Sequence, residues 1–291
     1  MDELQKYNNQ IIDKQNNQSI PDFEGYSPIE MQYILYEIFE KNSPIQLLEL
    51  SEQDYNIIPI LNQIKYLLQI IEKKRNLQLT AKGFLPTKIV SEIYNQKIIK
   101  DEMIESGILK PNREIDSMSI NLTRILSELS RVVKKRNNKL SLTKKGKVEL
   151  NDNHKLLESI FTTFGIKFNW AYYDGYGDNH IGQLGFGFSL VLLSKYGSEK
   201  RIDSFYSNKY FKAFPTLLDD IQLIKYNTKI NQATRCYSLR TFDRFLEYFG
   251  LIKIDTEKKY NSDKYIIKTE LFDKLINVQP HKNLNKSLAD R

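Results

Sequence analysis

Two carboxylates and one imidazole lie within seven residues of one another, at Asp174, Asp178 and His180. Carboxylate oxygens and imidazole nitrogens bind divalent metals, so these residues form the candidate centre of a metal-dependent enzyme. No second pair of ligands follows at a recognisable spacing, and Asp-Gly and Gly-Asp-Asn sequences are ordinary turn chemistry. We therefore expect a turn here, without a bound metal or cofactor.

The glycines that follow, Gly182, Gly185 and Gly187, precede an apolar run in the order Gly-x-x-Gly-x-Gly. This order reverses the dinucleotide-binding fingerprint, and the Lys-Ser/Thr pair of a phosphate loop is missing. Cys236 is the single cysteine, which excludes a disulfide within the chain and a zinc site built from several cysteines. Burial as a small apolar residue is a simpler interpretation of Cys236 than a role as nucleophile. With no catalytic pattern identified, a protein without enzymatic activity is favoured.

The strongest charge signal is basic and local. The whole chain carries a net charge of +7 and has a pI of about 9.1. Residues 124–147 include nine basic residues and one acidic residue, Glu128. The local excess of positive charge is therefore larger than the net charge of the whole chain. Such a concentration predicts a polyanionic partner, DNA or RNA. The nine residues are Arg124, Arg131, Lys134, Lys135, Arg136, Lys139, Lys144, Lys145 and Lys147.

The basic residues belong to a phrase that occurs twice after an amphipathic helix. In the first copy, the sequence Lys-Lys-Arg-Asn at 73–76 is followed by Leu-x-Leu-Thr-x-Lys-Gly at 77–83. The second copy has the same elements at 134–137 and 140–146, at offsets of 61 and 63 residues. The difference is a two-residue insertion, Asn138-Lys139, where we expect the hairpin tip and where insertions are tolerated. We interpret the phrase as one structural unit used twice.

Other helix and hairpin signals surround the repeat. Ser27-Pro28-Ile29-Glu30 predicts a helix start with a capping box. A third, partial copy follows Gly250, with strands expected at 251–254 and 265–269 and a tip at Lys258-Lys259-Tyr260-Asn261. This copy lacks the Thr-x-x-Gly element and is the weaker match.

The phrase Leu-x-Leu-Thr-x-Lys-Gly after an amphipathic helix resembles the second wing strand and the following turn of winged-helix proteins, which include bacterial transcription regulators. The stretch 77–85 is also similar to a motif of uncharacterised bacterial proteins. The resemblance covers residues 55–95 and 118–150, with 238–278 as a weaker third match. It implies that the helix before each hairpin can enter a DNA major groove, while the wing contacts phosphate.

The resemblance also implies positions for the contacts. Cations at the base or tip of a wing would be Lys73, Lys74, Arg75, Lys134, Lys135, Arg136 and Lys139. Lys82, Lys144, Lys145 and Lys147 would flank the strand exit. Side chains able to read base edges are few in the helices before the hairpins, with Gln63, Gln69, Asn121 and Arg124 as the exceptions. Contact with the phosphate backbone is therefore favoured over sequence-specific reading.

The predicted fold is mainly α with short β-hairpins (α+β), with tandem winged-helix-like units around a helical middle domain. A polar tail is expected at 1–20, and a helical region with the first unit at 21–110. The second, basic unit is expected at 111–151, and an aromatic-rich helical middle domain at 152–230. A further unit and a tail would complete the chain at 231–291.

Composition and hydropathy limit the partners. Hydrophobic residues make up 41% of the chain and charged residues 27%, which is typical of a folded protein. The apolar run Phe186–Leu193 is far shorter than the ~20 residues of a membrane span, and the segment Met1–Gln18 lacks the apolar core of a signal peptide. We therefore expect a cytoplasmic protein without a membrane partner.

The sequence leads to one favoured function and two alternatives. The favoured function is nucleic-acid binding through the basic wing, in a regulatory role. One alternative is an interaction or scaffold protein that uses the winged-helix units structurally and its middle domain as the surface for a protein partner. The other is a metal-dependent enzyme centred on the middle-domain loop.

Overall fold

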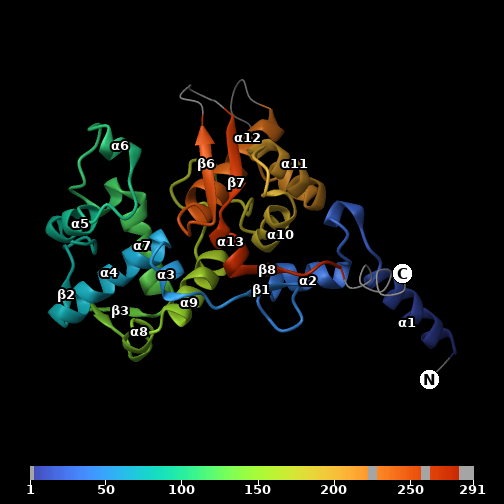
Figure 1. The fold of residues 1–291 in the computed structure, drawn as a ribbon, viewed down its shortest axis with the longest axis horizontal. Coiled ribbons are helices and arrows are strands. Elements are labelled where there is room, and N and C mark those ends of the chain that lie inside the picture. Colours follow the sequence, from blue (N-terminus) through green and yellow to red (C-terminus); the bar gives the residue numbers. More distant parts are fainter. Residues whose placement is uncertain (1–2, 222–227, 257–262, 282–291) are drawn as a thin grey trace. The chain divides into compact units, whose positions relative to one another are not determined.

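The computed structural model describes residues 3–221, 228–256 and 263–281 (Figure 1). The chain forms two compact units. Unit 1 consists of residues 1–48, 169–247 and 251–291, and unit 2 of residues 49–168 and 248–250. Helices dominate and the strands are short and antiparallel, which confirms the predicted α+β class with mainly helical content. Within the described ranges, no helix combines the length and apolar character that a membrane span requires.

Unit 2 contains one small sheet with helices packed against one of its faces. Its three strands are antiparallel and lie in the order β2-β4-β3. The elements are α3 (Glu52–Tyr55), α4 (Pro59–Lys74), β2 (Leu77–Gln78), α5 (Thr87–Tyr94), α6 (Glu102–Glu105), η2 (Glu114–Asp116), α7 (Met118–Leu129), β3 (Val133–Arg136), β4 (Lys139–Leu142), α8 (Lys144–Glu149) and α9 (Asn153–Ile166).

Helix α4 forms as its sequence predicts. Pro59 occupies the first turn, where its missing N–H is not needed. Ile64, Leu67, Leu68 and Ile71 recur at helical spacing and are fully buried, against α7 among other elements. The helix ends with cationic residues in its last turn, which interact favourably with the negative end of the helix dipole.

The two repeated phrases contribute strands to the same sheet. Leu77 of β2 lies directly opposite Leu140 of β4, and Gln78 lies opposite Lys139. In the first copy, residues 73–74 end helix α4 instead of forming a hairpin strand. This pairing corrects the expectation that 55–95 and 118–150 are separate helix-to-hairpin units. A two-residue strand has too few bonds to stand alone and needs the hairpin beside it.

The ends of the two phrases also fold differently. Gly83 closes a turn with a φ of +82°. The Thr80 hydroxyl accepts a hydrogen bond from the amide of Phe84, the residue after Gly83. In the second copy, the Thr143 hydroxyl instead caps helix α8 by accepting from the Gly146 amide at 2.9 Å. A Cβ atom on Gly146 would lie 2.0 Å from the Val132 carbonyl oxygen. The threonine and glycine of the phrase therefore form a turn in the first copy and the start of a helix in the second.

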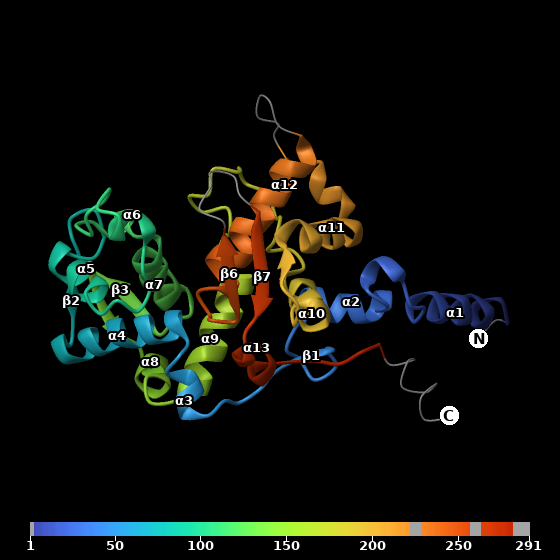
Figure 2. The same ribbon diagram turned by 45° about the horizontal axis from the view of Figure 1, so that its top comes forward.

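Unit 1 contains two small sheets (Figure 2). One has the strand order β5-β7-β6, and the other pairs β1 with β8. The elements are α1 (Glu3–Asn16), η1 (Pro21–Phe23), α2 (Pro28–Tyr36), β1 (Ile45–Leu47), α10 (Phe186–Tyr196), β5 (Arg201–Ile202), α11 (Asp203–Ala213), η3 (Pro215–Leu218), α12 (Lys229–Tyr237), the π-helical segment η4 (Ser238–Leu246), β6 (Ile252–Thr256), β7 (Lys264–Lys268), α13 (Glu270–Leu275) and β8 (Ile276–Val278).

The β5-β7-β6 sheet has the same element order as the sheet of unit 2. In each unit a helix precedes a two-residue strand, further helices follow, and a hairpin closes the sheet with its last strand in the middle. The weaker third phrase lies on the β6–β7 hairpin, while its predicted tip at 258–261 falls outside the described residues. The predicted middle domain is divided, since α9 belongs to unit 2 and α10 to α11 belong to unit 1.

The core of unit 1 is aromatic. Tyr206, Tyr210, Tyr237 and Phe242 are fully buried and meet in edge-to-face or tilted contacts, such as the 4.6 Å centroid separation of Tyr210 and Tyr237. The apolar run that begins at Phe186 forms the buried helix α10. The aromatic residues of this region therefore stabilise the interior of the unit.

Candidate nucleic-acid interface

The β3–β4 hairpin of unit 2 presents one apolar face and one basic face. Side chains of successive strand residues point to opposite sides of a sheet, and directly paired residues share a side. Val133, Leu140 and Leu142 are buried on the side that faces the helices. The opposite side, which we call the basic sheet face, carries Gln78, Lys134, Arg136, Lys139 and Ser141.

Three cations gather on the basic sheet face. Arg136 lies directly opposite Lys139, and Lys134 lies opposite Ser141 in the next pair of the same register. All three cations are exposed, and none has an ion pair with a carboxylate in the part of the chain that the structure describes. Like charges directly opposite in a sheet are destabilising, on the order of 0.2–1 kcal/mol. A bound anion would relieve this repulsion.

The hairpin tip is held in place by the strand beside it. Asn137 and Asn138 have φ values of +48° and +56°, as a two-residue type I′ turn requires. The Asn138 side-chain amide donates to the carbonyl oxygens of Leu79 and Thr80 at 3.2 and 2.7 Å. The Leu79 amide donates in return to the Asn138 carbonyl oxygen at 2.9 Å. The basic sheet face is therefore preorganised.

Helix α7, which precedes the hairpin, is committed to the interior. Three of the four polar residues considered for base reading form hydrogen bonds with other side chains of unit 2; one of them lies on α4 and two on α7. The Gln63 amide donates to the Thr123 hydroxyl at 2.8 Å, and both are buried. Asn121 and Arg124 each donate to the buried carboxylate of Glu114 at 2.6 Å. The expectation that these side chains are available to a DNA groove is corrected, because packing of α7 against α4, α5, α9 and η2 buries most of its surface.

Two of the twelve predicted contact residues take part in internal ion pairs. Arg124 binds the carboxylates of Glu114 and Glu128, and Lys145 lies 3.6 Å from Glu149. The Arg124 side chain is only 12% exposed, whereas the Lys145 side chain stays 45% exposed. The other ten are exposed and have no ion pair among the described residues. They are Lys73, Lys74, Arg75, Arg131, Lys134, Lys135, Arg136, Lys139, Lys144 and Lys147.

The register brings together only part of this set. Lys134, Arg136 and Lys139 share one face, whereas Lys135 projects to the other side of β3. A Cβ atom on Gly83 would lie 2.5 Å from the Lys135 ammonium nitrogen, so this lysine borders the loop that follows β2. Residues 73–75 lie at the end of α4, and Lys144 and Lys147 lie on α8. The sequence pattern predicts the cations but not which of them share a face of the sheet.

Gln78 completes the basic sheet face and was not among the predicted contacts. It pairs with Lys139, and its side-chain amide donates to the Asn138 carbonyl oxygen at 3.0 Å. Its only signal in the sequence was its place in the repeated phrase, between two leucines that both point inward.

The candidate metal centre of the sequence is a structural turn. The Asp174 carboxylate accepts from Arg240 at 2.5 Å, and neither side chain is exposed by more than 1%. Asp178 and His180 are exposed, and no cluster of three metal-binding side chains occurs in the residues described. Burial raises the pKa of the Cys236 thiol to about 12, which disfavours the reactive thiolate near neutral pH.

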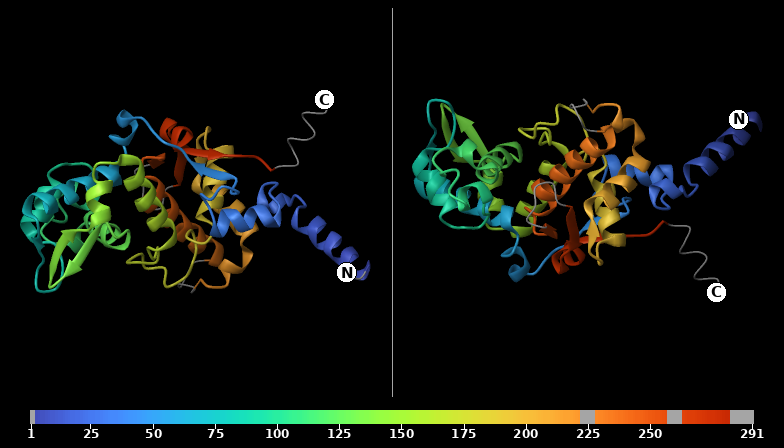
Figure 3. Two further views of the ribbon diagram at one scale, coloured as in Figure 1. Left: turned by 90° about the horizontal axis from the view of Figure 1, so that it is seen from below. Right: turned by 90° about the horizontal axis from the view of Figure 1, so that it is seen from above.

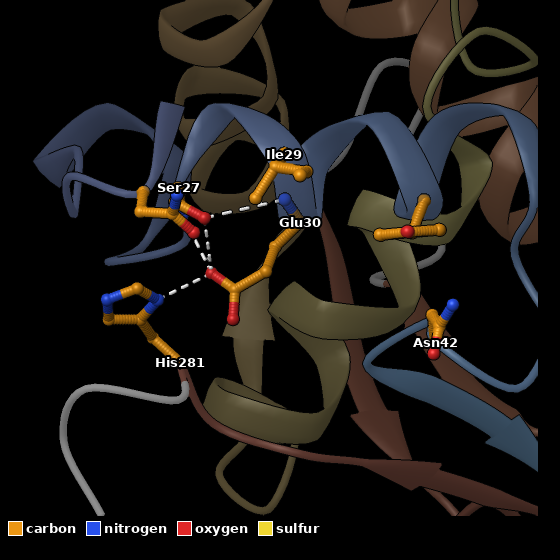
Figure 4. A pocket seen from close by; sticks show the side chains of 7 residues that line it. Ser27, Ile29, Glu30, Asn42 and His281 are labelled. Carbon is orange, nitrogen blue, oxygen red and sulfur yellow. Dashed lines mark hydrogen bonds and ion pairs between the residues drawn. The ribbon is translucent and has the colours of Figure 1, made fainter. Parts of the chain in front are cut away.

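A second polar cluster lies in unit 1 (Figure 4). The Glu30 carboxylate accepts from the Ser27 amide at 2.9 Å, and the Ser27 hydroxyl accepts from the Glu30 amide at 3.4 Å, which confirms the predicted capping box. His281 Nδ1 lies 2.5 Å from the same carboxylate, beside a cavity of about 280 Å³. Gln279 donates its amide to the Pro44 carbonyl oxygen, so this cluster helps to fix residues 276–281 against α2 and β1. We interpret it as a structural contact.

Comparisons with known proteins add no relative. No model of a protein family, no curated protein and no solved structure matches the chain. Function is therefore inferred from the geometry of the chain itself.

Proposed function

We propose that the protein binds nucleic acid through the sugar–phosphate backbone, with the basic sheet face of unit 2 as its contact surface. The observation that carries this proposal is the placement of Arg136 directly opposite Lys139, with Lys134 on the same face and no carboxylate partner among the described residues. Phosphate oxygens would neutralise all three cations. Their binding would also release the counterions condensed on the nucleic acid.

The basic sheet face carries both charged and neutral groups that are suited to contacts with phosphates. Arg136 presents a planar guanidinium that can bind one phosphate through two hydrogen bonds. The Ser141 hydroxyl and the Gln78 amide lie beside the cations on the same side of the sheet. Hydroxyl and amide side chains are common phosphate ligands and position a protein on its substrate. Because hydrogen bonds already hold the hairpin tip in place, its backbone loses little conformational entropy on binding.

We further propose that each unit is a winged-helix-like domain. Support comes from the shared element order and from the position of the last hairpin strand in the middle of both sheets. The two hairpins differ in charge. In unit 1, three cations on or beside the sheet have acidic partners, in the pairs Lys200–Asp255, Lys264–Asp243 and Lys268–Asp273, and Lys253 of β6 is the exposed cation without an ion pair among the described residues of these strands. The proposed binding surface is therefore confined to unit 2.

The proposed binding is weakly selective for base sequence. In a winged-helix-like domain the helix before the hairpin would read bases, but α7 of this chain has its polar groups engaged internally. Phosphate contacts carry no sequence information directly. We place the proposed activity in the cytoplasm.

A salt titration of the full chain tests the proposal. Fluorescence anisotropy with a labelled DNA would be measured from roughly 50 to 200 mM salt. The variant Lys134→Glu, Arg136→Glu, Lys139→Glu is expected to lose at least about tenfold in affinity. Its slope of log affinity against log salt should fall by about three, one for each lost phosphate contact.

The matched control reverses three exposed cations of unit 1 that have no ion pair among the described residues. The variant Lys212→Glu, Lys229→Glu, Lys253→Glu changes the net charge by the same amount. It should keep most of the affinity and the slope. Equal losses in both variants, or no binding of any DNA or RNA at low salt, would contradict the proposal.

A further inference from the structure

An apolar groove lies next to the hairpin tip of unit 2. Its volume is about 370 Å³, within the range of small-ligand pockets. One wall is the loop from Thr80 to Leu85, and the other is the segment Asn112–Ile115. We call this feature the loop groove.

The lining of the loop groove suits a flat apolar group. Phe84 and Leu85 are partly and fully buried, respectively, and Ile115 is 48% exposed. Glu114 also lines the groove, but its carboxylate is occupied by the Leu85 amide at 2.6 Å and by Arg124. The one carboxylate that lines the groove is therefore hydrogen-bonded and ion-paired within the wall.

Two exposed cations outside the basic sheet face border the loop groove, Lys82 and Lys135. Thr80, which lines it, accepts the hydrogen bond from the Asn138 side chain at the hairpin tip. The Lys135 ammonium group lies against Gly83 of the same loop, and Lys82 is exposed at the rim. Phosphate-binding cations and an aromatic, apolar groove therefore adjoin within one unit. This combination is used by proteins that bind single-stranded nucleic acid, where cations follow the backbone and aromatic rings stack on bases.

We propose that the loop groove takes an unpaired base of single-stranded nucleic acid, with the phosphates next to that base on Lys82 and Lys135 at the groove rim. This inference rests on the proposed function and names its substrate class. In a duplex the bases are stacked and paired, so none can enter the groove without being extruded. A single strand meets no such barrier. Stacking of one base on Phe84 is expected to raise affinity roughly tenfold.

Three probes of equal length test this inference on the full chain at one salt concentration. They are a labelled oligothymidine, the same sugar–phosphate chain without bases, and a duplex. We expect the oligothymidine to bind roughly tenfold more tightly than the abasic chain and more tightly than the duplex. Equal binding of oligothymidine and abasic chain overturns the base site but leaves backbone binding intact. Failure of all three probes to bind overturns the proposed function itself.

Two groove variants sharpen the test. Phe84→Leu keeps apolar volume but removes the aromatic ring, and Ile115→Ser changes a half-exposed wall residue with little risk to folding. Both should lower binding of oligothymidine towards the level of the abasic chain and leave abasic binding unchanged. Ile108→Ser is the control, because Ile108 is an exposed apolar residue of unit 2 outside the groove. An unchanged preference for oligothymidine in both groove variants would contradict the inference.

Discussion

Leu77 and Leu140 occupy the same position in a repeated phrase and lie directly opposite each other in one antiparallel sheet. Both side chains are buried on the side that faces the helices. The repeat thus marks the two strands that pair within a single unit. This pairing leaves Gln78 and Lys139 on the other side, where the basic sheet face begins.

Removal of the Leu140 side chain should destabilise unit 2 strongly. Leu140 is fully buried on the central strand, so Leu140→Ala is expected to lower the free energy of unfolding by about 2–5 kcal/mol. Denaturant unfolding followed by circular dichroism measures this change. Ile108→Ala, at a site with 68% exposure, is the control and should change it by less than about 0.5 kcal/mol. Similar effects of the two substitutions would show that the sheet is not packed as described.

Gly146 is expected to tolerate no side chain. Its Cβ atom would meet the Val132 carbonyl oxygen at 2.0 Å, and a backbone atom within a paired region cannot move aside easily. Gly146→Ala should therefore destabilise the protein by about 1–3 kcal/mol, although alanine favours helices. Lys147→Ala, in the next and exposed position of α8, should be nearly neutral. A thermal melt in which Gly146→Ala equals or exceeds the parent stability would refute the close approach.

Glu24 should make the stability of the protein depend on pH in the acidic range. Burial alone would raise the pKa of its carboxyl group, but hydrogen bonds from Lys195, Lys209 and Tyr196 outweigh this and lower the pKa below the ordinary value of 4.5. A lowered pKa means that the contribution to stability is complete above pH 4.5. It declines as the pH falls below that value and is lost once the pH has passed the lowered pKa.

The variant Glu24→Gln tests this dependence. At neutral pH it should be less stable than the parent by about 1.5–3 kcal/mol, since bonds to a charged, nearly buried group are removed. The difference should shrink as the pH is lowered through the window given above. Glu199→Gln serves as control, because Glu199 forms its ion pair at the exposed surface. A stability difference between Glu24→Gln and parent that stays constant from neutral to acidic pH would rule out the assigned role.

Local features of the fold could be predicted from the sequence. The capping box of Ser27 and Glu30, the buried stripe of α4 and the positions of the basic residues all depend on neighbours a few positions away. Such patterns are set by helix geometry and by charge density, which the sequence displays directly.

Long-range relations could not be predicted. Gln63 bonds to Thr123, and His281 lies beside Glu30, 251 residues away in the chain. Arg124 has one partner four residues away, Glu128, but its pair with the buried Glu114, ten residues away, depends on the packing of η2 against α7. The loop groove depends on the approach of two segments about thirty residues apart. None of these relations has a periodic signature, because tertiary packing alone creates them.

The pairing of β1 with β8 has a consequence for biosynthesis. These strands join residues 45–47 to residues 276–278, side by side in the left view of Figure 3, and the whole of unit 2 lies between them in the sequence. At translation rates of about 5–20 residues per second, β1 waits roughly ten to fifty seconds for its partner. Unit 2 has almost its whole sequence available during that interval. The nascent chain is therefore expected to present a folded basic unit while the first segment of unit 1 still lacks the strand that completes its sheet.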